Sequence, residues 1–218
     1  DQRGLVRLSA LQMFWYCLAM TTAESGTTTA NHPAYDLYMS SFEIYNEKIY
    51  DLMNKHKRLR MCEDSNKISK IVALSERKIT SEEDVSNYID KCKRYRQTGI
   101  SSKNNASSRS HAIYFLSIKK SNTQQSIKTI SFIDLAGSER AKGSIGDRNG
   151  MIESAFINQS LFSLKECIRA LYEKKKYIPY RRSKLTTLLK NYLNFNSKIV
   201  MITTIAPGNR SSDATLNS

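Results

Sequence analysis

Four cysteines, three prolines, eight glycines and three histidines are few for a chain of 218 residues. Collagen-like, disulfide-rich and zinc-finger classes depend on these residues, and none of those classes is predicted. The cysteines are dispersed and form no Cys-x-x-Cys pair, so neither a disulfide framework nor a metal cluster is expected, as suits a reducing cytoplasm.

Acidic residues are also scarce, since 20 Asp and Glu face 34 Lys and Arg, which gives a net charge of +14. A charge of this size predicts an acidic partner, such as nucleic acid, anionic lipid or an acidic protein polymer. A solvated basic face without a partner is the alternative.

Long hydrophobic runs are missing as well. The best candidate, residues 8–20 (LSALQMFWYCLAM), is shorter than the roughly 20 residues that a bilayer core requires. It also lacks the basic flank and the small-residue cleavage site of a signal peptide. We therefore expect it to form part of a buried helix, and we expect no membrane partner.

Hydrophobic periodicity switches repeatedly between helical and strand spacing along the chain. Helices are expected at residues 4–20, 80–99, 151–172 and 181–193. Strands are expected at residues 37–46, 112–120, 126–136 and 198–206, with a surface hairpin or strand pair over 54–67. Of these strands, 112–120 and 126–136 should be antiparallel neighbours, and the apolar run 198–206 should be buried on both faces. Interleaved helices and strands predict an α/β fold in one domain.

Two polar stretches carry the chemistry. Asp134 ends an apolar strand and Gly137 follows it, which is how magnesium and phosphate sites are built in α/β folds. The stretch NNASSRSH (104–111) offers serine hydroxyls that could bind magnesium or hold an attacking water, and Arg109 could pair with Glu139. Each feature alone is more often a turn, a cap or a weak surface ion pair. Together, at these spacings, they favour a nucleotide site.

The same stretches resemble the motifs of kinesin motor domains. Residues 104–111 match the N-x-x-S-S-R-S-H element, and residues 134–139 match D-L-A-G-S-E. Residues 41–53 (SFEIYNEKIYDLM), 157–171 (INQSLFSLKECIRAL) and 177–189 (YIPYRRSKLTTLL) are similar to the family's strand-and-turn signature, relay helix and tubulin-binding loop and helix. The LKECIRAL portion is closest to the kinesin-13 branch, whose members depolymerise microtubules. The resemblance implies a three-layer fold of the P-loop NTPase type, with a central mixed sheet and helices on both faces, incomplete at its N-terminal end.

The resemblance also implies a role for each matching residue, with ATP or ADP and Mg²⁺ as cofactors. The implied catalytic residues are Ser107, Ser108, Arg109, Gly137 and Glu139. The implied nucleotide contacts are Asn104, Ser107, Ser108, Asp134 and Gly137. Magnesium would be held by Ser108 and, through water, by Asp134. Arg109 and Glu139 would form the salt bridge that closes the two switch loops during hydrolysis.

Further positions would couple the nucleotide to the microtubule. Arg96 falls beside the family's magnesium cluster, and Asn158 falls at the start of its relay helix. The implied tubulin-binding residues are Lys165, Glu166, Arg169, Arg181 and Lys184. Tubulin is acidic, so it would give the positive charge a partner, although each lysine alone is more often a solvated surface residue. No nucleic-acid recognition motif accompanies the charge, and nucleic acid is not expected as a partner.

One essential motif is absent from this chain. A kinesin needs a P-loop, G-x-x-x-x-G-K-[ST], and the sequence contains no Gly-Lys dipeptide; ESGTTTA at 24–30 is the nearest imitation. Either residues 1–218 are a partial motor domain, or the protein is a degenerate kinesin that binds microtubules without hydrolysing ATP. On the first interpretation the intact protein is a microtubule-stimulated ATPase of the cytoplasmic cytoskeleton, of the depolymerising kinesin-13 type, and this chain alone is inactive.

Overall fold

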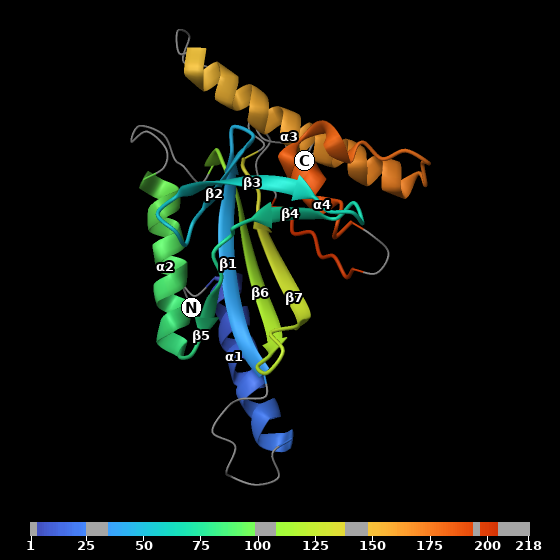
Figure 1. Cartoon of the computed structure of the whole chain (residues 1–218). Helices are drawn as coiled ribbons and strands as arrows, with labels where there is room; N and C mark the ends of the chain where they lie inside the picture. Colours follow the sequence, from blue (N-terminus) through green and yellow to red (C-terminus); the bar gives the residue numbers. More distant parts are fainter. Residues whose placement is uncertain (1–3, 25–34, 99–107, 138–147, 194–196, 205–218) are drawn as a thin grey trace. The chain divides into compact units, whose positions relative to one another are not determined.

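The structure is a computed structural model that describes residues 4–24, 35–98, 108–137, 148–193 and 197–204 (Figure 1). The helices are α1 (Leu5–Glu24), α2 (Glu82–Thr98), α3 (Arg148–Tyr172), the 3-10 turn η2 (Tyr180–Arg182) and α4 (Lys184–Leu189). The strands are β1 (Tyr35–Tyr45), β2 (Lys48–Asp51), β3 (Lys57–Glu63), β4 (Ser69–Val72), β5 (Arg77–Ile79), β6 (His111–Lys120) and β7 (Ser126–Asp134). No described helix is both long and apolar enough to cross a bilayer.

Two compact units make up the chain. The first, here called the sheet unit, contains residues 1–45, 49–60 and 71–135. The second, here called the helical unit, contains residues 46–48, 61–70 and 136–218. Each unit is described by itself below.

Strand β1 is the centre of the sheet, whose strand order is β4-β3-β2-β1-β6-β7, with β5 also paired to β1. β1 and β6 are antiparallel, and their register brings Ile44 opposite His111. β6 and β7 are antiparallel too, with Ala112 opposite Asp134. The antiparallel neighbours expected at 112–120 and 126–136 are therefore confirmed, and the end of β7 lies beside the start of β6.

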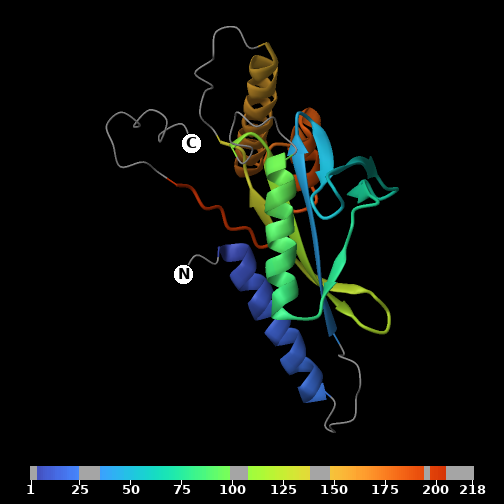
Figure 2. The ribbon, with the colours of Figure 1, turned by 90° about the vertical axis from the view of Figure 1, so that its left-hand side faces the viewer.

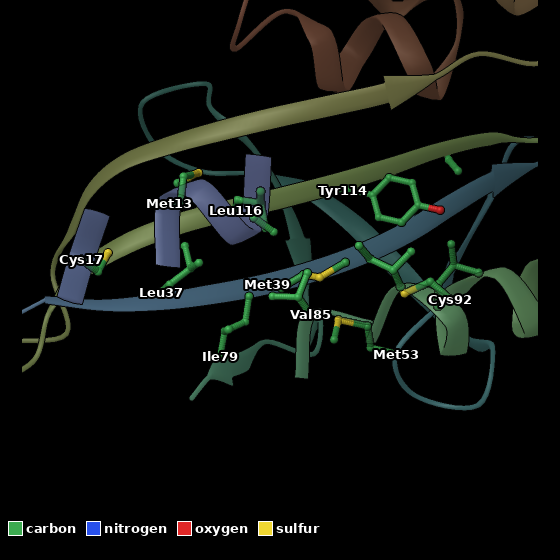
Figure 3. Packing of buried hydrophobic residues seen from close by; sticks show 14 residues of the cluster. Met13, Cys17, Leu37, Met39, Met53, Ile79, Val85, Cys92, Tyr114 and Leu116 are labelled. Atoms are coloured by element: carbon green, nitrogen blue, oxygen red, sulfur yellow. The ribbon is translucent and has the colours of Figure 1, made fainter. Parts of the chain in front are cut away.

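The core of the sheet unit lies between one face of the sheet and the two helices α1 and α2. Alternate residues along β1 and β6 point to this face, because successive side chains of a strand alternate between its two sides. The helices meet them with buried residues at helical spacing. The buried residues are Ala10, Met13 and Cys17 of α1, Val85, Ile89 and Cys92 of α2, Leu37 and Met39 of β1, Ala112, Tyr114 and Leu116 of β6, and Leu52, Met53 and Ile79 (Figure 3). α1 and α2 also contact each other along this face (Figure 2).

The opposite face of the central strands is covered as well. Phe42 and Ile113 are completely buried, and Ile44 is nearly so. Phe42 packs against Phe115 with 5.7 Å between the ring centroids. β1 and β6 are thus buried on both faces, as expected for the central strands of a layered α/β sheet.

Helix α2 begins with a cap formed by the side chains of Ser81 and Asp84. The Asp84 backbone N–H donates to Ser81 Oγ at 3.2 Å, and Asp84 Oδ2 accepts from the Ser81 backbone N–H at 3.1 Å. Asp84 Oδ2 also accepts from the Thr80 hydroxyl at 2.6 Å. This reciprocal box satisfies amides that the first turn would leave unpaired. It fixes the start of the helix whose last turn carries Arg96.

In the helical unit, α3, η2 and α4 contact one another. The prediction of a continuous helix at 181–193 is wrong. The segment is divided at Ser183, whose backbone is extended (φ −148°, ψ 161°). Ser183 Oγ accepts from the Thr186 backbone N–H, and Thr186 Oγ1 accepts from the Ser183 backbone N–H. This capping box starts a new helix at Lys184 and leaves η2 as a separate turn.

The prediction of a buried strand at 198–206 is also wrong for residues 198–204, the part that the structure describes. Residues 198–204 have no regular secondary structure. Val200 is 85% exposed and Ile202 is 70% exposed. An apolar run becomes a buried strand only where neighbouring strands satisfy its backbone, and no strand among the described residues pairs with it. Residues 205 and 206 lie outside the described residues.

Candidate functional site

The first motif stretch lies at the entrance of β6. Ser108 and Arg109 are half-buried in a short turn, and Ser110 and His111 after them are buried. Asn104, Ser107 and Glu139 lie outside the described residues, so the expected pairing of Arg109 with Glu139 stays a prediction. Gly137 is half-buried and belongs to the helical unit, whereas Ser108 and Arg109 belong to the sheet unit.

Arg96 joins two residues of this region, Ser110 and Asp134, through three contacts. Its Nη1 lies 2.5 Å from Asp134 Oδ2, its Nε donates to Ser110 Oγ at 3.2 Å, and its Nη2 donates to the Ser110 carbonyl at 2.8 Å. The antiparallel register that brings Asp134 beside the start of β6 makes these three contacts geometrically compatible. One guanidinium therefore links the last turn of α2, the start of β6 and the end of β7.

The ion pair is asymmetric in its exposure. The Arg96 side chain is only 9% exposed, whereas the Asp134 side chain is 60% exposed. A buried guanidinium requires a partner, and a carboxylate and a carbonyl supply it here. Asp134 is therefore held from the protein side through Oδ2 while its carboxylate faces water.

His111 belongs to the same cluster. Burial, and then the positive charge of Arg96, lower the pKa of His111 to about 4, although Asp134 acts in the opposite direction. At neutral pH the imidazole is uncharged. A buried, uncharged ring at the entrance of β6 suits a structural role.

The few oxygen donors in this region are typical of a magnesium ion that keeps most of its bound waters. They are not typical of a metal ion held by many protein side chains. No group of three or more His, Cys, Asp or Glu that could hold a metal ion occurs among the described residues. Mg²⁺ keeps several waters and commonly takes one or two protein oxygens plus phosphate oxygens. Asp134, with its exposed carboxylate, and the Ser108 hydroxyl are donors of this kind, so these residues fit magnesium.

The residues expected to meet tubulin all lie in the helical unit. Lys165 and Arg169 are exposed on α3, and Arg169 Nη1 lies 2.9 Å from Glu166 Oε1, one turn earlier. The Arg181 side chain is 79% exposed on η2. Lys184 is half-buried at the start of α4, where its backbone N–H donates to Glu47 Oε2 at 2.8 Å. Asn158 is exposed on α3, within the helix and not at its start.

Sequence reasoning missed the residues that hold η2 and the end of α4 to residues 61–70, the part of the β3–β4 hairpin that lies in the same unit. Glu63 pairs with Arg181 and with Lys190, and the Asn191 side chain bonds to the backbone of Ser69. The partners are 118 to 127 residues apart in sequence. No local pattern links residues at such separations, so only the structure could reveal these contacts.

Comparison with known proteins defines the class. The kinesin motor domain family matches residues 1–218. The structure is similar to that of the C-terminal motor and motor homology domain of Kar3Vik1 fused to a synthetic heterodimeric coiled coil, with a TM-score of 0.77 and 30% identity over 98% of this chain and 55% of that one. The chain therefore belongs to the kinesin motor domain family, and the fold inferred from its motifs is confirmed.

The curated relatives narrow the class to the kinesin-13 branch. The chain is 42% identical to kinesin-like protein KIN-13B of Arabidopsis thaliana over 87% of its length, and 40% identical to KIN-13A of Oryza sativa subsp. japonica over 92%. It is 44% identical to human kinesin-like protein KIF24 over 83% of its length. The chain spans 29%, 27% and 13% of the lengths of these three relatives, respectively. The resemblance to kinesin-13 proteins that the LKECIRAL portion indicated is thus confirmed.

Proposed function

We propose that residues 1–218 are part of an ATP-dependent microtubule motor of the kinesin-13 type, which couples hydrolysis of Mg-ATP to tubulin binding. The observation that supports it best is the Arg96 cluster, which joins Asp134 of one motif to Ser110 of the other. Two motifs that lie far apart in sequence are thereby linked in one unit. Such an arrangement suits a site that must sense a single ligand.

Each residue of the cluster then has a task. Arg96 orients Asp134 through their ion pair, and the exposed carboxylate would hold the water shell of the metal ion. Ser108 would supply a hydroxyl oxygen to the ion, while Asn104 and Ser107 would contact the phosphates and position the attacking water. Bound Mg²⁺ would supply positive charge that offsets the charge of the phosphates. Gly137 would offer its backbone N–H to the terminal phosphate.

The switch between strong and weak tubulin binding would come from a residue pair that spans the two motifs. Arg109 and Glu139 would pair while the terminal phosphate is present and separate after its loss, an order-and-position change typical of nucleotide switches. Asn158 and the rest of α3 would transmit this change to the tubulin-binding residues. In a kinesin-13 protein the output would be bending of protofilament ends, in the microtubule cytoskeleton of the cytoplasm and at the spindle.

The decisive test is steady-state ATPase activity of the protein that contains this chain, measured with and without microtubules. Strong stimulation by microtubules, lost in Glu139→Ala, is the expected result. The second candidate is a catalytically dead microtubule-binding module, which would need no P-loop; residues 1–218 contain no Gly-Lys dipeptide. Tight, ATP-independent microtubule binding without hydrolysis would establish that alternative.

A competition assay separates tubulin from other acidic partners. If the charge of +14 serves microtubule binding, unlabelled tubulin displaces the protein from microtubules and duplex DNA at the same charge concentration does not. Equal competition by DNA would mean that charge alone, and not the η2–α4 region, determines the partner.

A further inference from the structure

Three of the residues expected to meet tubulin, Glu166, Arg169 and Arg181, form ion pairs in the structure, and Arg181 is the most exposed of them. Its charge nevertheless already has a partner within the protein. Arg181 Nη2 lies 3.1 Å from Glu63 Oε2, with the Arg181 side chain 79% exposed and the Glu63 side chain 32% exposed. An exposed ion pair of this kind is weak, because water screens both charges. Arg181 can therefore leave Glu63 at little cost.

Glu63 itself is held in place without Arg181. Its other oxygen, Oε1, lies 2.8 Å from Lys190 Nζ, and Lys190 Nζ also donates to the Lys67 carbonyl at 2.9 Å. These contacts lower the pKa of Glu63, with the Lys190 hydrogen bond as the largest cause, so the carboxylate is ionised at neutral pH.

The hairpin that carries Glu63 is fixed to α4 by a second set of contacts. Asn191 Oδ1 accepts from the Ser69 backbone N–H at 3.1 Å, and Asn191 Nδ2 donates to the Ser69 carbonyl at 2.7 Å. Asp64 Oδ1 accepts from the Ile68 backbone N–H at 2.9 Å and shapes the turn. The carboxylate of Glu63 is thus placed by a structured hairpin, and Lys190 continues to balance its charge when Arg181 departs.

We propose that Glu63 is an internal counter-ion that competes with the acidic surface of the microtubule for Arg181. This inference rests on the proposed function, because the competitor is tubulin. When Arg181 pairs with Glu63, its charge is partly cancelled; when it pairs with a tubulin carboxylate, Glu63 keeps Lys190. The hairpin therefore lowers the affinity for microtubules. A lower affinity suits a protein that must also dissociate from the microtubule.

The test is a double-mutant cycle of Glu63→Gln and Arg181→Ala, read as the dissociation constant for stabilised microtubules by cosedimentation at low salt. In the protein that contains this chain, E63Q is expected to tighten binding about two- to fivefold, as for the loss of one exposed ion pair. In the R181A background the same change should have no more than the small effect of the charge loss itself. The matched control is Glu173→Gln, which removes the same charge from the same unit but frees Lys175, 2.6 Å away; its effect should be smaller and independent of Arg181.

A second variant separates competition from net charge. Glu63→Asp keeps the charge but shortens the side chain, so Arg181 should be released and binding should still tighten. Hydrogen exchange at the Ser69 amide checks that the hairpin remains docked in each variant.

The outcomes distinguish the two proposals. If wild-type protein does not bind microtubules, the proposed function fails and the counter-ion proposal falls with it. If wild-type protein binds, the counter-ion proposal alone is overturned by any of three results: E63Q tightens binding equally with and without Arg181, E63Q behaves like E173Q, or E63Q weakens binding.

Discussion

Arg96 Nη1 lies 2.5 Å from Asp134 Oδ2, and this contact joins the last turn of α2 to the last residue of β7. The same guanidinium bonds to both the hydroxyl and the carbonyl of Ser110. Arg96 is therefore a positioning residue, and its removal should also lower the stability of the fold. The carboxylate that would face magnesium depends on a helix that starts 52 residues before it in the sequence, at Glu82.

Arg96→Ala should destabilise the protein. The substitution removes the two hydrogen bonds that Arg96 donates to Ser110. It also removes the ion pair between Arg96 and Asp134. We expect a loss of about 1–3 kcal/mol in the free energy of unfolding, measured by urea denaturation. Arg94→Ala, at an exposed position of the same helix, is the control and should leave the unfolding midpoint unchanged. Equal midpoints for R96A and wild type would show that the Arg96 contacts contribute nothing.

His111 should make the stability depend on pH in the acid range. Its folded pKa is about 4, below the ordinary value of 6.5, so the folded state binds fewer protons than the unfolded state between these values. The contribution is complete above pH 6.5, falls as the pH decreases and is lost near pH 4, with a total on the order of 3 kcal/mol. Unfolding at pH 7, 5.5 and 4 measures it. His111→Gln should flatten this slope, and an unchanged slope would contradict the assignment.

The four cysteines should differ in reactivity toward thiol reagents. Cys62 is exposed, whereas Cys17, Cys92 and Cys167 are buried. Burial raises the pKa of Cys17 to about 11 and that of Cys92 to about 12, which suppresses the reactive thiolate. At pH 8 one thiol should react quickly and the other three only on unfolding, as counted by mass spectrometry. Cys62→Ser should abolish the fast phase; rapid labelling of Cys92 in that variant would contradict the packing of α2 on the sheet.

Ser183→Ala should weaken the start of α4. The variant loses the side-chain acceptor for the Thr186 backbone N–H, at a buried position. We expect a loss of about 1 kcal/mol in the free energy of unfolding and faster hydrogen exchange at the first amides of α4. Ser65→Ala, exposed in the β3–β4 hairpin, is the control. If the two variants unfold alike, the capping box is not what divides η2 from α4.

The parts of the fold that the sequence predicted are those with a local cause. Hydrophobic periodicity predicted the helix that became α2, and it predicted β6 and β7 as antiparallel neighbours. Asp134, Ser108 and Arg96 were singled out because they fall on positions of a known family, and their roles at the site stay predictions. Glu63 and Lys190 were not found, because their pairing depends on a contact between segments more than 100 residues apart. The strand expected at 198–206 failed for a related reason, since an apolar run does not specify which neighbour will pair with it.

Strand β7 ends the strand order of the sheet, and among the described residues no strand covers its outer edge. Ile127 and Ile130 on this strand are each 44% exposed. An uncovered edge with apolar side chains is a template for pairing with another chain. Produced by itself, this chain should therefore self-associate as its concentration rises. A further strand of the same protein, or an added peptide, that pairs with this edge should prevent the self-association.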